Sequence, residues 1–156
     1  MSKQSAGILV FRIIENALPE TLLVHPGGPF YRSKDLGVWS VPKGEFEDNE
    51  DPLEVAKREF YEETGNRIHS QNFIRLKPVK TKGGKTVHVW AVEENFDKCY
   101  ISSNTFELEW PPESGKTKLF PECDDAAWFN FKEAAEKIFP YQKPLIEELI
   151  MIIKNT

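Results

Sequence analysis

The chain has 156 residues, a formal net charge of −5 and 40% apolar residues. This length suits one domain, expected over residues 1–156, and the apolar fraction excludes a chain that is mainly disordered. The acidic balance argues against a nucleic-acid polymer as the main partner, because such proteins need a clustered basic surface. A small nucleotide remains open as a ligand, since a cation can bridge an acidic protein and an acidic molecule.

The sequence has no feature of a secreted or membrane protein. No stretch approaches the roughly 18 apolar residues of a membrane span, and the N-terminus lacks the apolar region of a signal peptide. Cys99 and Cys123 lack CxxC spacing and a neighbouring histidine, so we expect two reduced thiols rather than a zinc site. We therefore expect a soluble, cytoplasmic protein that does not bind membranes and is a monomer or homodimer.

Short apolar and β-branched runs between turn signals predict strands along most of the chain. These strands are expected at residues 6–14, 21–24, 37–41, 72–80, 86–93 and 126–129. The turn Lys82-Gly83-Gly84-Lys85 predicts a hairpin between the fourth and fifth of them. Irregular loops are expected at residues 25–37 and 106–118.

Two helices are expected at the end of the chain. Asn130 and Glu133 have the spacing of a capping box for a helix over residues 131–138, which ends before Pro140. The last segment places five apolar residues at helical spacing: Leu145, Ile146, Leu149, Ile150 and Ile153. Strands on both sides of one central helix, followed by these two helices, predict a mixed α/β (α+β) sandwich.

The central helix is expected over residues 51–65. Asp51 suits its N-cap, Pro52 its first position, and Glu54 could complete a capping box. Gly65 is the residue expected just after a helix ends. One stripe of the helix should face the core: Leu53, Ala56 and Phe60.

Glu59, Glu62 and Glu63 fall on one side of this helix, within an arc of roughly 100°. The last turn carries the negative end of the helix dipole, which disfavours an anion there by about 0.3–1 kcal/mol. Glu59 and Glu63 also repel each other at i,i+4 spacing. Three acids alone are most simply a solvated helix face. Their unfavourable placement instead suggests function, because Mg²⁺, or Mn²⁺, would turn repulsion into ligation.

The surrounding residues carry a resemblance to the Nudix hydrolases. From Gly44 the chain reads GEFEDNEDPLEVAKREFYEETGN. The Nudix signature is Gly, five residues, Glu, seven residues, Arg-Glu-aliphatic, one residue, Glu-Glu, one residue, Gly, aliphatic. Eight positions match: Gly44, Glu50, Arg58, Glu59, Phe60, Glu62, Glu63 and Gly65. Asn66 differs from the signature, because the family has an aliphatic residue at this position. That residue packs the loop after the helix.

The resemblance implies a Nudix-type α/β/α sandwich with a mixed β-sheet and a magnesium-dependent enzyme that cleaves phosphoanhydride bonds. By motif position, the resemblance implies that the metal is bound by the carboxylates of Glu59, Glu62 and Glu63. The backbone carbonyl of Lys43 would complete the metal site. Arg58 would orient the glutamates, and Glu50 would support the site through hydrogen bonds or water. Gly44 and Gly65 are the fixed glycines of the motif.

The general base varies within this family between a motif glutamate and an acid on a later loop. Glu122 is the later candidate, because its offset of six residues from Trp128 is similar to that of the loop glutamate in triphosphate-cleaving members. The alternative for Glu122 is a solvated loop acid.

Residues 39–44, WSVPKG, narrow the substrate class, because they are similar to the Trp- and Pro-Lys-Gly-containing segment of dinucleoside polyphosphate (diadenosine tetraphosphate) hydrolases and diphosphoinositol phosphatases. Lys43 could contact a substrate phosphate, and Trp39 is a further candidate for substrate binding. A base needs an aromatic face, and the candidates in loops are Phe30, Tyr31 and Trp110. A small nucleotide, most similar to a dinucleoside polyphosphate, is therefore the expected substrate. The alternatives are a housecleaning nucleoside triphosphate pyrophosphatase and a non-catalytic module that senses a nucleotide. Activity on 5′-triphosphate RNA fits the acidic chain less well.

Overall fold

The computed structural model describes residues 3–96 and 103–155. A seven-stranded mixed sheet forms its middle layer, with the order β4-β6-β1-β2-β9, while β3 pairs with β1 and β5 pairs with β6. Its strands are β1 (Gln4–Arg12), β2 (Glu20–Pro26), β3 (Lys43–Phe46), β4 (Ile74–Arg75), β5 (Val79–Lys80), β6 (Thr86–Glu93) and β9 (Cys123–Asn130). Only the pairing of β1 with β6 is parallel within this sheet.

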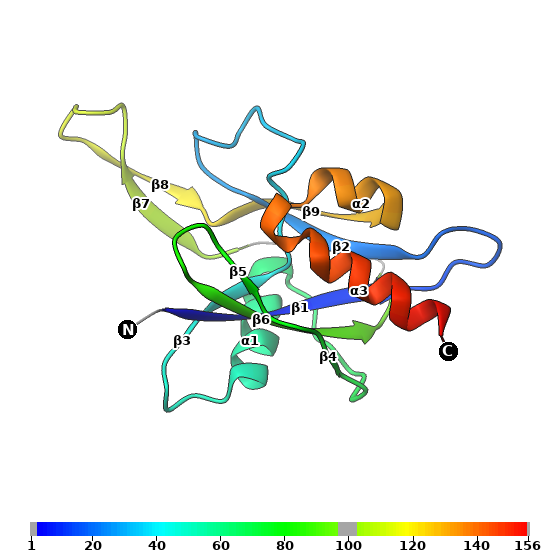
Figure 1. Cartoon of the computed structure of the whole chain (residues 1–156). Coiled ribbons are helices and arrows are strands. Elements are labelled where there is room, and N and C mark those ends of the chain that lie inside the picture. Colours follow the sequence, from blue (N-terminus) through cyan, green and yellow to red (C-terminus); the bar gives the residue numbers. More distant parts are fainter. Residues whose placement is uncertain (1–2, 97–102, 156) are drawn as a thin grey trace.

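Helices cover both faces of the sheet (Figure 1). On one face α1 (Pro52–Thr64) buries Phe60 against Ile8. On the other, α2 (Phe131–Lys137) and α3 (Lys143–Lys154) pack on a core that contains Leu9. Ile8 and Leu9 serve opposite cores because successive side chains of a strand point to opposite faces. These two cores confirm the predicted α/β/α sandwich.

The central strand β1 changes its partner midway. Residues Gln4 to Gly7 pair with β3, whereas Phe11 and Arg12 pair with β2. The strands β2 and β3 therefore diverge from a shared neighbour, and the segment before β3 bridges back to β2 at Val24 and Ser40. This divergence positions the candidate site.

The strand predicted at residues 37–41 is wrong. Trp39 and Ser40 form only isolated bridges, and the strand lies after the proline, at Lys43–Phe46. Pro42 has no N–H, but its carbonyl accepts a hydrogen bond from Ile8 N at 3.1 Å. The proline therefore still joins the edge of β1, and pairing continues beyond it.

The strand predicted at residues 72–80 divides into the short strands β4 and β5. Between them, Lys77 N donates to Glu148 Oε1 at 2.8 Å instead of to a neighbouring strand, and Pro78 has no N–H to donate. The hairpin prediction for residues 82–85 is confirmed, since β5 pairs antiparallel with β6.

The loop predicted at residues 106–118 is also wrong, because a separate hairpin occupies this region. It consists of β7 (Thr105–Glu109) and β8 (Thr117–Pro121), with Trp110-Pro111-Pro112 at its turn. The hairpin extends away from the main sheet (Figure 1). Phe106 and Leu108 alternate with exposed residues, as in a strand, and the paired prolines lie only at the turn.

Within the described residues, no helix has both the length and the apolar character needed to cross a membrane. Cys123 is buried, and Cys99 lies outside the described residues.

Candidate active site

The helix α1 begins and ends at the predicted residues. The Asp51 side chain accepts a hydrogen bond from Leu53 N at 3.2 Å, and Gly65 ends the helix at φ 77°, in the left-handed region. The prediction of a capping box with Glu54 is wrong. The Asp51 carboxylate accepts its hydrogen bond from Leu53 N, and the Glu54 carboxylate accepts one from Lys57 Nζ at 3.4 Å. Both ends of the glutamate-bearing helix are thus defined by local hydrogen bonds.

Gly44 of β3 allows the helix and the strand to approach closely. A Cβ atom on Gly44 would lie 2.3 Å from Glu59 Oε1 and 2.2 Å from Glu59 Cδ. Any other residue would therefore collide with this carboxylate. The Glu59 side chain, 16% exposed, lies directly over the strand at the glycine that opens the motif.

Glu63 is the most deeply buried of the three glutamates, with 7% of its surface exposed. Its Oε2 accepts from Lys43 N at 3.1 Å, and its Oε1 accepts from Cys123 Sγ at 3.2 Å. Burial raises the pKa of Glu63 to about 8. Burial, followed by the neighbouring Glu62 carboxylate, raises the pKa of Glu59 to about 7.

Arg58 lies among three acids, with its side chain half exposed. Its guanidinium nitrogens lie 3.6 Å from Glu50 Oε2, 3.9 Å from Glu59 Oε1 and 3.8 Å from Glu62 Oε1. Glu50 also accepts from Glu47 N at 2.9 Å. This arrangement matches the predicted positions of Arg58 and Glu50 beside the glutamates.

The residues present fit a hard divalent cation. Glu59, Glu62 and Glu63 offer carboxylate oxygens from one helix, and Gly44 leaves room for the first of them. Raised pKa values of two neighbouring carboxyl groups indicate a site where added positive charge would be favourable. Among the described residues, no three His, Cys, Asp or Glu side chains lie close enough together to hold a metal ion in the present side-chain positions. Glu62 faces Arg58, and Glu63 faces Lys43 and Cys123.

A cavity of about 240 Å³ adjoins the motif at Glu63. Lys43, Glu63 and Glu122 line it, so the structure brings the predicted loop acid to the motif. The Glu122 carboxylate is a lesser cause of the raised pKa of Glu59, after burial and the Glu62 carboxylate. The remaining lining residues are Val24, Pro26, Ser40, Val41, Cys123, Phe139 and Tyr141.

Phe139 and Tyr141 were missed by the sequence analysis. Phe139 lies just before the 3-10 turn η1 (Pro140–Gln142), and Tyr141 lies within it. Their ring centroids are 6.0 Å apart. The aromatic-Pro-aromatic sequence between two helices was the available signal. Nothing local to this segment, however, shows that it contacts the segment before β3, about 100 positions earlier.

Gln142 holds this aromatic turn against the start of the motif. Its fully buried side chain accepts from Val41 N at 3.0 Å through Oε1. Its Nε2 donates to Ser40 Oγ at 2.9 Å and to the Tyr141 hydroxyl oxygen at 2.8 Å. The tyrosine ring is thereby fixed at the wall of the cavity.

The two aromatic residues predicted to bind substrate have different positions. Trp39 is 6% exposed, donates from Nε1 to Asp35 Oδ1 at 2.9 Å and packs 4.8 Å from the Phe129 ring. It lies in the core behind the cavity and does not line it. Tyr31 meets Phe139 edge to face at 6.3 Å, which places it at the margin of the aromatic wall.

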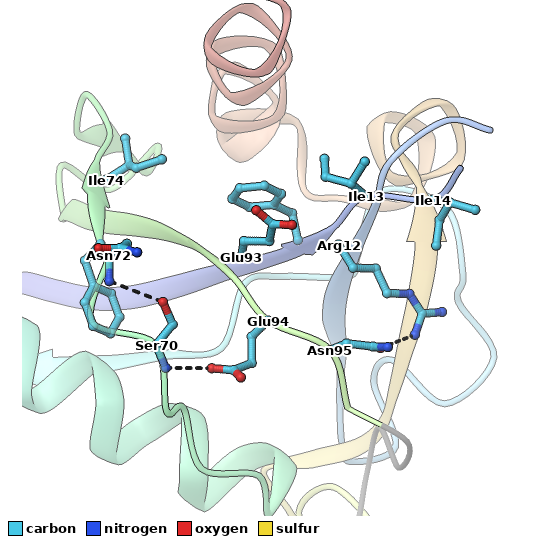
Figure 2. A pocket seen from close by; sticks show the side chains of 11 residues that line it. Arg12, Ile13, Ile14, Ser70, Asn72, Ile74, Glu93, Glu94 and Asn95 are labelled. Carbon is cyan, nitrogen blue, oxygen red and sulfur yellow. Dashed lines mark hydrogen bonds between the residues drawn. The ribbon is translucent and has the colours of Figure 1, made fainter. Parts of the chain in front are cut away.

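A larger cavity, of about 750 Å³, lies at the carboxyl ends of β1 and β6, away from the motif (Figure 2). Its polar groups already bind one another. Arg12 Nη1 donates to Asn95 Oδ1 at 2.8 Å, and Glu94 Oε1 accepts from Ser70 N at 2.9 Å. No motif residue lines it, so the smaller cavity is the candidate active site.

Comparisons with known proteins agree with this geometry. The family model described as the NUDIX domain matches residues 3–149. An RNA pyrophosphohydrolase of Rhizobium meliloti (strain 1021) is 31% identical over 127 residues, which cover 72% of this chain and 71% of the relative. Nudix hydrolase 25 of Arabidopsis thaliana is 29% identical over 122 residues, covering 73% of this chain and 70% of that protein.

Two solved structures share the fold. The C. elegans Ap4A hydrolase in a binary complex has a TM-score of 0.70 and 20% identity, covering 97% of this chain and 99% of its own. The NUDIX domain of Shewanella oneidensis NrtR, solved with ADP ribose, has a TM-score of 0.67 and 16% identity, covering 98% and 89%. The match to the family model over nearly the whole length confirms the resemblance found in residues 44–66. The chain therefore belongs to the Nudix hydrolase family.

Proposed function

We propose that this Nudix hydrolase cleaves a phosphoanhydride bond in a nucleoside diphosphate derivative, with a dinucleoside polyphosphate as its substrate. The observation that supports this proposal most strongly is the composition of the 240 Å³ cavity. Carboxylates, an ammonium group and aromatic rings line the same small space: Glu63, Glu122, Lys43, Phe139 and Tyr141. These groups match the metal-bridged phosphates and the base of a nucleotide.

Glu59, Glu62 and Glu63, with the Lys43 carbonyl, would hold Mg²⁺, or Mn²⁺. When bound, the ion would polarise the phosphoryl oxygens and activate a water molecule. The Lys43 N–H holds Glu63, and Arg58 lies within 4 Å of both Glu59 and Glu62, so these two residues would orient the ligands.

Glu122 would accept the proton of the attacking water. It lines the cavity beside Glu63, and its charge interacts with that of Glu59. The Lys43 ammonium group would meet the phosphate that leaves. Phe139 and Tyr141 would offer ring faces to a base, and Tyr31 would support them from the margin.

A second candidate substrate is RNA that carries a 5′-triphosphate. It is favoured by the curated relatives of 28–31% identity that are named RNA pyrophosphohydrolase. The acidic chain, with its charge of −5, favours the small nucleotide instead.

A cytoplasmic location stays a prediction from the sequence.

The test is an incubation with Mg²⁺ in ¹⁸O-labelled water, followed by mass analysis of both products. Diadenosine tetraphosphate, deoxynucleoside triphosphates and a 5′-triphosphorylated oligonucleotide are compared. We expect ATP and AMP from diadenosine tetraphosphate, and loss of turnover by orders of magnitude in Glu62→Gln. The matched control is Glu54→Gln, an exposed acid in the first turn of the same helix.

Pyrophosphate released from a triphosphate, with diadenosine tetraphosphate left intact, would show a nucleoside triphosphate pyrophosphatase instead. Nucleotide binding without Mg²⁺-dependent turnover of any substrate would show a sensing module. Either result overturns the proposed substrate.

A further inference from the structure

A second cavity, of about 700 Å³, adjoins the candidate active site. Tyr141 lines both cavities and is their shared wall. The other residues of the second cavity come from β5 with the residues before it and from α3: Lys77, Pro78, Val79, Lys80, Pro144, Glu147, Glu148 and Met151. We propose that this second cavity binds a nucleoside that is joined to the far side of the scissile polyphosphate. This inference rests on the proposed function and specifies its substrate.

The size of the first cavity supports this division. Its volume of about 240 Å³ is below the roughly 300–1,000 Å³ of a cavity that encloses a drug-sized ligand. It suits one nucleotide end with its metal-bound phosphates. A ligand with two nucleoside units must extend beyond it, and the space past Tyr141 is the adjoining cavity.

The apolar lining suits a nucleobase. Pro78 and Pro144 are exposed apolar residues of the lining, Val79 is buried, and Met151 is 59% exposed on α3. An exposed methionine is a flexible, polarisable surface that packs well against rings of different shape. Tyr141 adds an aromatic ring to this lining, and a base stacked on such a ring is recognised by its π-face with little sequence preference.

The charges of the cavity are divided between its two sides. Lys77 and Lys80 are exposed on the strand side, whereas Glu147 and Glu148 lie on the helix side. Glu148 is engaged, since it accepts from Lys77 N at 2.8 Å, and this bond joins the two sides. The phosphates should therefore follow the lysine side, and the base should lie over Met151.

The experiment compares substrates that differ only in the second nucleoside. Diadenosine tetraphosphate is paired with adenosine 5′-tetraphosphate, and a 5′-triphosphorylated dinucleotide is paired with ATP. The variants are Met151→Asp and Lys80→Glu. Their matched controls are Leu119→Asp, which replaces a residue 65% exposed on β8, and Lys82→Glu, an exposed lysine of the same hairpin outside the cavity.

For the cavity variants we expect a fall of about tenfold in kcat/KM for the substrate with two nucleosides. We expect unchanged values for its partner with one nucleoside, and unchanged values for both in the controls. A fall in the diadenosine tetraphosphate pair alone supports the proposal. A fall in the RNA pair alone overturns it, because the second nucleoside of that substrate is joined to the first nucleoside and not across the scissile polyphosphate. Equal changes within both pairs, or no change in either, overturn the proposal.

The two proposals fail in distinguishable ways. If the protein turns over none of these substrates, the proposed function is wrong. The cavity is then tested by calorimetric binding of diadenosine tetraphosphate and adenosine tetraphosphate to the unsubstituted protein in the presence of Mg²⁺. Tighter binding of the first ligand, lost in Met151→Asp, would still support the second cavity, and equal binding would overturn it.

Discussion

The glutamates of α1 occupy positions that are unfavourable for stability alone. Glu63 is buried beside Cys123, and Glu59 lies over Gly44 with Glu62 as a charged neighbour. Their placement at the negative end of the helix adds to this cost. The sequence identified these acids because the spacing of the motif is local. It could not identify Tyr141 or Gln142, whose role depends on contacts with residues about 100 positions away.

Gly44→Ala tests the close approach of strand and helix. The added Cβ would lie 2.3 Å from Glu59 Oε1, so the carboxylate or the strand must move. We expect kcat/KM to fall by at least about tenfold, since displacements of about 1 Å already cost activity, and Mn²⁺ affinity to fall with it. Gly83→Ala is the control, because its Cβ would meet only Thr81 Oγ1, at 3.9 Å. Full activity and metal affinity in Gly44→Ala would show that this contact is unimportant.

At the scale of the elements, local signals and long-range pairing were predictable to different degrees. The helix α1 and the strand β6 lie where the sequence placed them, because a cap, a glycine and a run of β-branched residues are local features. The strand β3 and the hairpin β7–β8 were misplaced. Each forms by pairing with another strand, and a proline near it is tolerated at an edge or a turn.

Gly65→Ala tests the end of α1. Gly65 has φ 77° and donates its N–H to Tyr61 O at 2.7 Å, so an alanine there would be strained. We expect urea unfolding to show a loss of about 1 kcal/mol in the free energy of unfolding. Gly65→Asn should lose less, because asparagine tolerates the left-handed region. An unchanged midpoint in Gly65→Ala would contradict a structural role for this glycine.

At the scale of the whole molecule, the buried carboxyl groups should make stability depend on pH and on added Mg²⁺. The pKa values of Glu59 and Glu63 are about 7 and about 8, above the ordinary value of 4.5. Between about pH 4.5 and 8 the folded protein therefore binds more protons than the unfolded chain, so stability falls as pH rises. Mg²⁺ should oppose this loss, because it binds the ionised carboxylates.

This prediction is checked by thermal unfolding between pH 5 and 8, with and without Mg²⁺. The Tm of the metal-free protein should fall towards pH 8 more than the Tm of Glu59→Gln/Glu63→Gln. This variant is the control because it retains the other titrating groups, including His88, whose pKa is lowered. Mg²⁺ should raise the Tm most at pH 8 and only in the unsubstituted protein. A parallel pH dependence of both proteins would contradict the assigned burial of these carboxyl groups.

The proposed activity requires one physical event, the binding of a hard cation by the last turns of α1. It is measured most directly by calorimetric titration of Mg²⁺ at pH 7.5, in buffers of different ionisation enthalpy, with the protein and with Glu59→Gln/Glu62→Gln/Glu63→Gln. We predict uptake accompanied by proton release, because Glu63 gives up its proton to bind the ion, and no uptake by the folded triple variant. Equal uptake by both proteins, or none by either even with a nucleotide present, would contradict it.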